Sequence, residues 1–142
     1  MGTTNFDTVV ATTVQNSEGA LHPSHYELLT FFIAGNQSAS VKKAGAIVPF
    51  AASIVDVRAY VDTAPATTSL IIDVNKNGTT VFTTQGNRPT IAAAGNASTT
   101  TLPDVTAVAA GDRITFDIDA VGTGTVGADL YLTIALKRAN VA

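Results

Sequence analysis

The fold is decided by RITFDIDA, residues 113–120, and DLYLTIALK, residues 129–137. Apolar and polar side chains alternate through both stretches. Successive side chains of a β-strand point to opposite faces, so each stretch predicts a strand with one buried and one polar face. The side chains predicted to be buried are Ile114, Phe116, Ile118, Ala120, Leu130, Leu132, Ile134 and Leu136. Strands with one polar face are typical of antiparallel sheets.

Upstream segments continue this β pattern. Residues 54–62 alternate, which predicts that Val55, Val57, Ala59 and Val61 share the buried face. Residues 70–74 and 79–83 flank Asn75-Lys76-Asn77-Gly78, and an Asn-Gly pair between two strands predicts a hairpin. Residues 46–50 contain Pro49, which predicts a short edge strand or a bend.

The most apolar segment is residues 28–33, which Gly35-Asn36 ends. A continuous apolar run of this length predicts a strand covered on both faces. We expect one face to enter the core and the other to lie under the N-terminal segment or against a second subunit. The residues assigned to this core or interface strand are Leu28, Leu29, Phe31, Phe32 and Ile33.

Turn-rich segments separate these strands, among them residues 85–100 and the glycine-rich residues 122–127. Short strands punctuated by turns are typical of a β-sandwich, and no segment carries a helical stripe. We therefore predict an all-β fold: an antiparallel, jelly-roll-like β-sandwich of about eight strands over residues 26–142.

Residues 1–25 differ from the rest, because they mix threonine and amide side chains with few large apolar ones and lack a clean period. One interpretation is a frayed terminus. The other is an extended N-terminal arm that docks on a neighbouring subunit. The predicted arm anchors are Phe6, Val9, Val10 and Val14.

Composition excludes several classes of protein. The chain has 142 residues, a net charge of −3, 46% hydrophobic residues and no cysteine. The negative charge argues against nucleic-acid binding, and the lack of cysteine excludes disulfides and zinc–thiolate sites. No apolar run is long enough for a membrane span. Only 13% of the residues are charged, so we expect surfaces that suit contact with other subunits.

Candidate sites for chemistry are few. Asp73-x-Asn75-x-Asn77-Gly78 matches the start of a calcium loop, but the twelfth position is Thr84 instead of a glutamate. The strand carboxylates of Asp56, Asp62, Asp117 and Asp119 are interpreted as surface charge, with Arg58 and Arg113 as potential ion-pair partners.

The histidines His22 and His25 are too few for a convincing metal set, although a shared metal at a symmetry axis stays an alternative. No nucleophile-elbow, phosphate-loop or dinucleotide motif is present. We expect no enzyme activity, no catalytic residue, no metal and no cofactor.

Residues 70–82, LIIDVNKNGTTVF, and residues 110–119, AGDRITFDID, resemble β-sandwich modules of tailed-bacteriophage virion proteins. Such modules occur in head decoration proteins and at the tips of tail or head fibres. The resemblance lies between residues 53 and 136, and its motifs are turn-and-strand patterns.

The resemblance implies a capsid decoration, or cementing, protein on the outer surface of a phage head, made in the host cytoplasm. It implies a homotrimer that binds the major capsid protein, while the charge and the lack of a long apolar run predict no nucleic-acid or membrane partner. The alternative is a receptor- or carbohydrate-binding module of a phage fibre, in which residues 85–100 and 122–129 would form the site and Tyr60 or Tyr131 would stack on a sugar.

Overall fold

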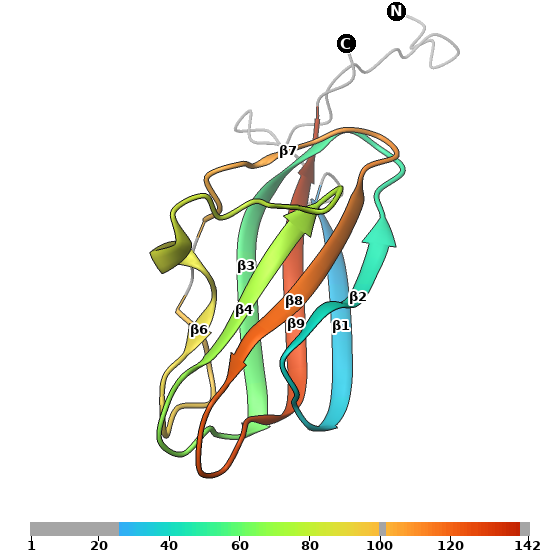
Figure 1. Ribbon diagram of the computed structural model, residues 1–142. Helices are drawn as coiled ribbons and strands as arrows, with labels where there is room; N and C mark the ends of the chain where they lie inside the picture. The colour runs from blue at the N-terminus through green and yellow to red at the C-terminus, as the bar shows by residue number, and fades with distance from the viewer. Residues whose placement is uncertain (1–25, 100–101, 140–142) are drawn as a thin grey trace, which may run out of the picture.

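The computed structural model describes residues 26–99 and 102–139, which form two packed antiparallel sheets (Figure 1). The first sheet contains, in order, β1 (Tyr26–Asn36), β9 (Ala128–Arg138), β3 (Ala52–Thr63) and β7 (Ala107–Val108). The second contains β2 (Ser40–Ile47), β8 (Arg113–Val121), β4 (Leu70–Lys76) and β5 (Thr79–Thr80), and β6 (Thr90–Ile91) also pairs with β4. A 3-10 turn, η2, covers Gln85–Asn87. No helix in these residues is long and apolar enough to cross a membrane.

The strand order is that of a jelly roll. β1 pairs with β9, β2 with β8, β3 with β7, and β4 with both β5 and β6, as in one long hairpin rolled into two sheets. Additional pairing of β9 with β3 and of β8 with β4 joins the rolled pairs. The predicted all-β, jelly-roll-like sandwich is therefore confirmed. The described residues form nine strands, close to the predicted number of about eight, and two short strands, β5 and β6, both pair with β4.

The core lies between the sheets and follows the predicted alternation. The apolar side chains on the inner faces of β4 and the middle of β9, together with Ile114, Phe116 and Ile118 of β8, are fully or almost fully buried. The prediction that Ala120 is buried was wrong: it is only half-buried, because the register of β8 against β4 shifts just before it. β1 contributes Phe31, whose ring centroid lies 5.4 Å from that of Phe116 on the opposite sheet. The buried centre comprises Leu70, Ile72, Val74, Ile114, Phe116, Ile118, Leu130, Leu132, Ile134 and Leu136.

A bulge in β3 changes one predicted face. The register of β3 against β9 shifts between Ile54 and Asp56. Ile54 and Val57 are both buried as a result, while Val55 is only half-buried. The prediction that Val55 shares the buried face was wrong, because the bulge inserts one extra residue and reverses the alternation on one side of it.

The second strand also differs from the prediction. β2 begins at Ser40 and ends at Ile47, before Pro49, whose nitrogen has no hydrogen to donate to a ladder. Its register against β8 shifts between Ser40 and Ala44, and Lys42 lies in this irregular part with a φ of +52°. The backbone N–H of Lys42 donates to Asp117 Oδ1 at 2.6 Å. The predicted edge segment, residues 46–50, therefore contains only the end of this strand.

The predicted hairpin is confirmed, but its second strand, predicted over residues 79–83, covers only Thr79–Thr80. β4 and β5 pair through Lys76 and Thr79, with Asn77-Gly78 as the two-residue turn. Both turn residues have positive φ, +52° and +90°, which glycine and asparagine tolerate best. The predicted loop of residues 85–100 contains η2 and β6, and its Ser98 N–H donates to the Ala59 carbonyl, so the loop follows the free edge of β3 beyond β7.

Candidate functional site

Three aromatic side chains form a row across the outer surface of the first sheet. Phe32 of β1 is paired with Tyr131 of β9, which is paired with Tyr60 of β3. The ring centroids of Phe32 and Tyr131 lie 4.7 Å apart, and those of Tyr131 and Tyr60 lie 6.1 Å apart. Tilted ring pairs at these distances are favourable, so the three rings stabilise one another on the surface of the sheet.

The row is exposed and continues along β1. Phe32 is 53% exposed, Tyr60 is 45% and Tyr131 is 40%, and Leu28 on the same side of β1 is 64% exposed. Tyr26 completes the patch at the start of the strand. We call Tyr26, Leu28, Phe32, Tyr60 and Tyr131 the aromatic face. Contiguous exposed apolar side chains of this size are typical of interaction sites.

A shallow hollow of about 280 Å³ borders the aromatic face. Tyr60 and Tyr131 line it together with Arg58, Ser98 and Thr133. The Tyr131 hydroxyl donates to Asp62 Oδ2 at 3.2 Å. Desolvation and this hydrogen bond to the carboxylate raise the pKa of Tyr131, so its hydroxyl stays a donor. The hollow is thus lined by two aromatic rings and by polar groups.

The outer surface of the second sheet is different. We call Asp73, Asn75, Thr115, Asp117 and Asp119, on β4 and β8, the polar face. Asp73 and Asp117 are direct cross-strand partners. Like charges in such a pair repel each other, so this arrangement depends on compensating hydrogen bonds.

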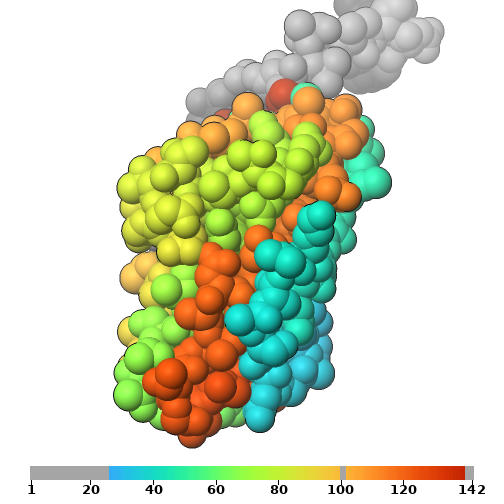
Figure 2. Space-filling model, viewed as in Figure 1, coloured from blue at the N-terminus to red at the C-terminus, as the bar shows by residue number. Residues whose placement is uncertain are grey.

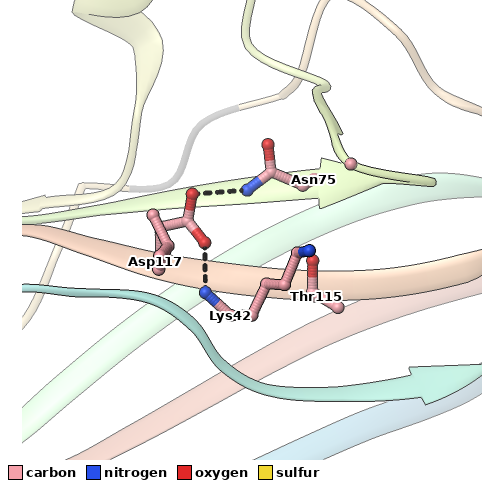
Figure 3. A pocket seen from close by; sticks show the side chains of 6 residues that line it. Lys42, Asn75, Thr115 and Asp117 are labelled. Atoms are coloured by element: carbon pink, nitrogen blue, oxygen red, sulfur yellow. Dashed lines mark hydrogen bonds between the residues drawn. The ribbon is translucent and has the colours of Figure 1, made fainter.

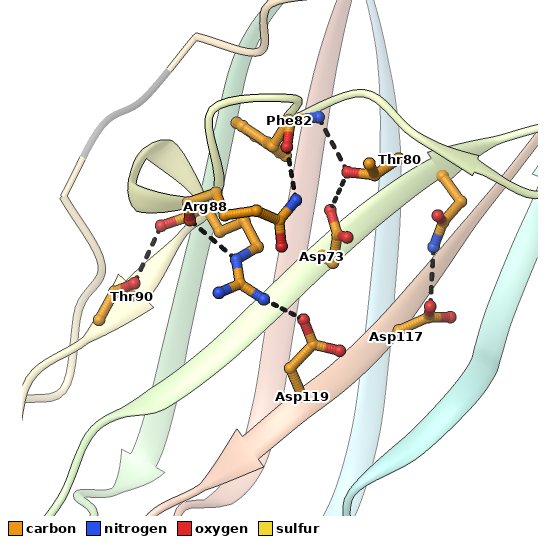
Figure 4. Close-up of polar contacts among 9 residues, drawn as sticks. Asp73, Thr80, Phe82, Arg88, Thr90, Asp117 and Asp119 are labelled. Carbon is orange, nitrogen blue, oxygen red and sulfur yellow. Dashed lines mark hydrogen bonds and ion pairs between the residues drawn. The ribbon is translucent and has the colours of Figure 1, made fainter.

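Hydrogen bonds within the chain provide that compensation (Figure 4). The Thr80 hydroxyl donates to Asp73 Oδ1 at 2.6 Å, and Arg88 forms an ion pair with Asp119. Burial of Asp73 raises the pKa of its carboxyl, the nearby charges of Asp119 and Asp117 raise it further, and the Thr80 hydrogen bond opposes both effects.

Asp117 connects the polar face to the irregular part of β2 (Figure 3). Its Oδ2 accepts a hydrogen bond from the Asn75 amide at 2.9 Å, and its Oδ1 accepts the one from the Lys42 backbone. Thr115, Lys42 and Asp117 line a shallow hollow of about 280 Å³ here. Both carboxylate oxygens are engaged, so Asp117 acts as a structural acceptor.

The residues of the calcium-like motif form hydrogen bonds within the chain, and those of Asn77 lie at the hairpin turn. The Asn77 amide donates to Asp112 Oδ1 at 2.7 Å, and its Oδ1 accepts the Arg113 N–H at 2.9 Å. Asp73, Asn75 and Asn77 therefore have three separate sets of partners and do not converge. Within residues 26–99 and 102–139, no three acidic or histidine side chains are grouped to hold a metal ion.

The residues predicted on the apolar strand divide between its two faces. Leu29, Phe31 and Ile33 pack against the core, whereas Leu28 and Phe32 point outward and are exposed. The expected cover over the outer face is not provided by the described residues. The arm, residues 1–25, with its anchors Phe6, Val9, Val10 and Val14, and both His22 and His25 lie outside the described residues, so those assignments stay predictions.

The surface charges have partly the predicted partners. Arg58 Nε lies 2.5 Å from Asp56 Oδ2, as expected. Asp119 pairs with Arg88, not with Arg58 or Arg113. Sequence reasoning placed Tyr60 and Tyr131 on the non-core faces of their strands but missed the row, because Phe32, Tyr131 and Tyr60 come together only through the pairing of three distant strands.

Neither a protein-family model nor a curated protein matches this sequence. Among solved structures, the chain is similar to a chain of the "Cyanophage Pam1 capsid asymmetric unit". The TM-score is 0.50 at 10% sequence identity, and the match covers 96% of this chain and 98% of that chain. At this identity the similarity shows the fold alone.

Proposed function

We propose that this chain is a non-enzymatic structural protein of a phage virion, and specifically a decoration protein on the outer surface of the head. The observation that carries the proposal is the aromatic face: Leu28, Phe32, Tyr60 and Tyr131 form a contiguous exposed patch on the outer surface of the first sheet. The likeness of the whole fold to a chain from a phage capsid supports the same setting.

The proposed partners are further copies of this chain, as a homotrimer, and the major capsid protein. Burying an exposed phenylalanine or leucine stabilises a contact by about 1.5–3 kcal/mol, so a few such residues are sufficient for a weak interface. Several linked copies raise the overall affinity for a symmetric surface. The arm anchors Phe6, Val9, Val10 and Val14, and the outward residues Leu28 and Phe32, form the proposed interfaces. The chain would be made in the host cytoplasm and assembled into the virion.

The test uses heads of the encoding phage from which this chain has been deleted. Purified full-length protein is expected to sediment with these heads. The binding should be saturable, and it should raise the thermal stability of the heads. Phe32→Asp should weaken binding about tenfold or more, because it places a charge within the interface. Val41→Asp is the matched control, because it charges an exposed valine on β2 of the other sheet. Failure of the wild-type chain to sediment with the heads would contradict the proposal.

The hollow beside Tyr60 and Tyr131 favours a second candidate, a carbohydrate-binding module. Sugars stack on exposed aromatic rings, and Arg58, Ser98 and Thr133 supply hydrogen-bonding groups around them. This candidate predicts retention on a glycan array that Tyr60→Ala abolishes. An array without hits, combined with saturable binding to heads, would favour the decoration protein.

A further inference from the structure

β1 and β2 lie side by side along one long side of the sandwich and end the two sheets there (Figures 1 and 2). The edge of β2 is poorly suited to pair with another strand. It carries Lys42 and Lys43, and its register is broken between Ser40 and Ala44. Lysines and bulges on an edge strand prevent further strands from adding to the sheet.

The edge of β1 has no such protection. Among the described strands, only β9 pairs with it, and the register is regular from Tyr26 to Ile33. Its one charged residue, Glu27, lies 3.9 Å from Arg138 of β9. At the far end, the Gln37 amide donates to the carbonyl oxygens of Ile33 and Gly35. The edge from Tyr26 to Phe32 thus presents regular backbone donors and acceptors.

The core is also incomplete beneath this edge. Leu29, Phe31 and Ile33 face the core but are only half-buried, whereas Leu130 and Leu132 of the adjacent β9 are fully buried. On the outer side, Leu28 and Phe32 are exposed. A strand added beside β1 would cover both sets, because its side chains point alternately to the two faces.

One segment of the chain has the composition for this position. Residues 8–14, TVVATTV, match the length of Tyr26–Phe32 and contain no charge, proline or glycine. Valine and threonine favour strands. In an extended segment, Val10 and Val14 share one face, while Val9 and Ala11 share the other. Both faces of such a strand are therefore suited to the two apolar surfaces beside β1.

The proposal assigns the segment to another copy. In the sequence, residues 15–25 join it to the start of β1. A segment donated by a neighbour would link the copies, as the proposed homotrimer requires, whereas a segment paired with its own β1 would link nothing.

We propose that residues 8–14 of a neighbouring copy add a strand to the free edge of β1, next to Tyr26–Phe32, and so extend the β1-β9-β3-β7 sheet between subunits. Addition of an extended segment to an open sheet edge supplies backbone hydrogen bonds, and alternate side chains supply specificity. The inference deepens the proposed function, since it specifies where the arm docks and which edge of the sandwich faces a neighbour.

The test is amide hydrogen exchange on the full-length protein, with solution mass measured by light scattering on the same samples. The β1 amides should exchange about tenfold or more slowly than the β2 amides, in a multimer, and this protection should fall on dilution as the mass falls. Val10→Asp should remove the protection of β1 and lower the mass. Thr3→Asp, a charge elsewhere in the N-terminal segment, is the matched control. Unchanged exchange in β3 and β9 shows that each variant is folded.

Three results would overturn the proposal. In the first, the β1 amides exchange as fast as those of β2. In the second, Val10→Asp leaves a concentration-dependent protection of β1 unchanged, and the occupant is then another part of the second copy. In the third, β1 is protected in a monomer at every concentration, and the arm then pairs with its own copy. Binding to deleted heads is a separate measurement, so it distinguishes failure of this inference from failure of the proposed function.

Discussion

The outer surfaces of the two sheets differ in the partners that their side chains have within the chain. On the polar face, each of Asp73, Asp117 and Asp119 has a hydrogen-bond or ion-pair partner supplied by the same chain. On the aromatic face, Phe32 and Leu28 are exposed among the described residues, and Phe32 has the Tyr131 ring beside it. The carboxylates of the polar face are thus satisfied within one subunit, whereas we propose that the aromatic face is a contact surface.

The largest expected effect separates two adjacent phenylalanines of β1. Phe31 packs on Phe116 in the core, whereas Phe32 is exposed. Phe31→Ala should lower the free energy of unfolding by about 2–4 kcal/mol, because it leaves a cavity. Phe32→Ala should lower it by less than about 1 kcal/mol. Urea denaturation of both variants, at a protein concentration where the wild type is monomeric, provides the measurement. Equal losses would mean that the aromatic face is a structural part of the subunit.

The next effect concerns the polar face. Asp117→Ala removes the acceptor for both the Lys42 backbone and the Asn75 amide. Each lost hydrogen bond to a charged group costs about 1–3 kcal/mol, so we expect a loss of that order in the free energy of unfolding. Binding to heads should not change once the sample is folded. Thr79→Ala, at an exposed position of β5, is the control. Loss of head binding by the folded Asp117 variant would assign a contact role to this surface.

A smaller effect follows from the raised pKa of Asp73. The folded state holds the proton of this carboxyl more tightly than the unfolded state. The resulting stability is fully present below the ordinary aspartate pKa and is lost as the pH rises through the raised value. Asp73→Asn keeps an acceptor for the Thr80 hydroxyl but cannot ionise, so its stability does not fall as the pH rises. At a pH above the raised pKa of Asp73, the variant should therefore be more stable than the wild type by less than about 1 kcal/mol.

Denaturation of both proteins from acidic to neutral pH measures this difference. Asp112 has the opposite behaviour, because the Ala109 N–H and the Asn77 amide lower its pKa. Its stabilising contribution is lost as the pH falls, equally in both proteins, and cancels in the comparison. A constant difference in stability across the pH range would contradict the assignment to Asp73.

The smallest effect is spectroscopic and belongs to the aromatic face. Asp62→Asn should lower the pKa of Tyr131, because it removes the negative charge that accepts the tyrosine hydrogen bond. Tyrosinate absorbance during an alkaline titration measures the shift, and Glu27→Gln is a control that removes a charge elsewhere in the same sheet. An unchanged titration would show that the Asp62 carboxylate does not contribute to the raised pKa of Tyr131.

The sequence was sufficient to predict the sandwich, because alternation in residues 113–120 and 129–137 and the Asn77-Gly78 turn are local signals. It did not predict the register shifts, among them those in β2 and β3. A single extra residue at Ile54–Asp56 changes pairing and leaves no mark in composition. The sequence analysis did not predict most of β2, because Lys42 and Lys43, which protect its edge, are not typical strand residues.

The candidate site could not be predicted because it depends on strand pairing and register, which single-sequence patterns do not specify. Sequence reasoning assigned Leu28 and Phe32 to the apolar strand but could not separate them from the inward-facing Leu29, Phe31 and Ile33 until the register was known. The row of Phe32, Tyr131 and Tyr60 requires three strands from separate parts of the chain. The same is true of the Arg88–Asp119 ion pair, because Arg88 lies between η2 and β6 whereas Asp119 lies on β8, on the other side of β4.

The pairing of β1 with β9 has a consequence for biosynthesis. β1 is translated about a hundred residues before the strand that it pairs with, and contacts of such long range are typical of slow folding. During that interval both apolar sides of β1, including Phe31 and Phe32, are exposed on the nascent chain. Exposed apolar segments of this kind aggregate or bind chaperones. We therefore expect the yield of folded protein from cells to depend on chaperone supply and growth temperature more strongly than the stability of the finished sandwich would indicate.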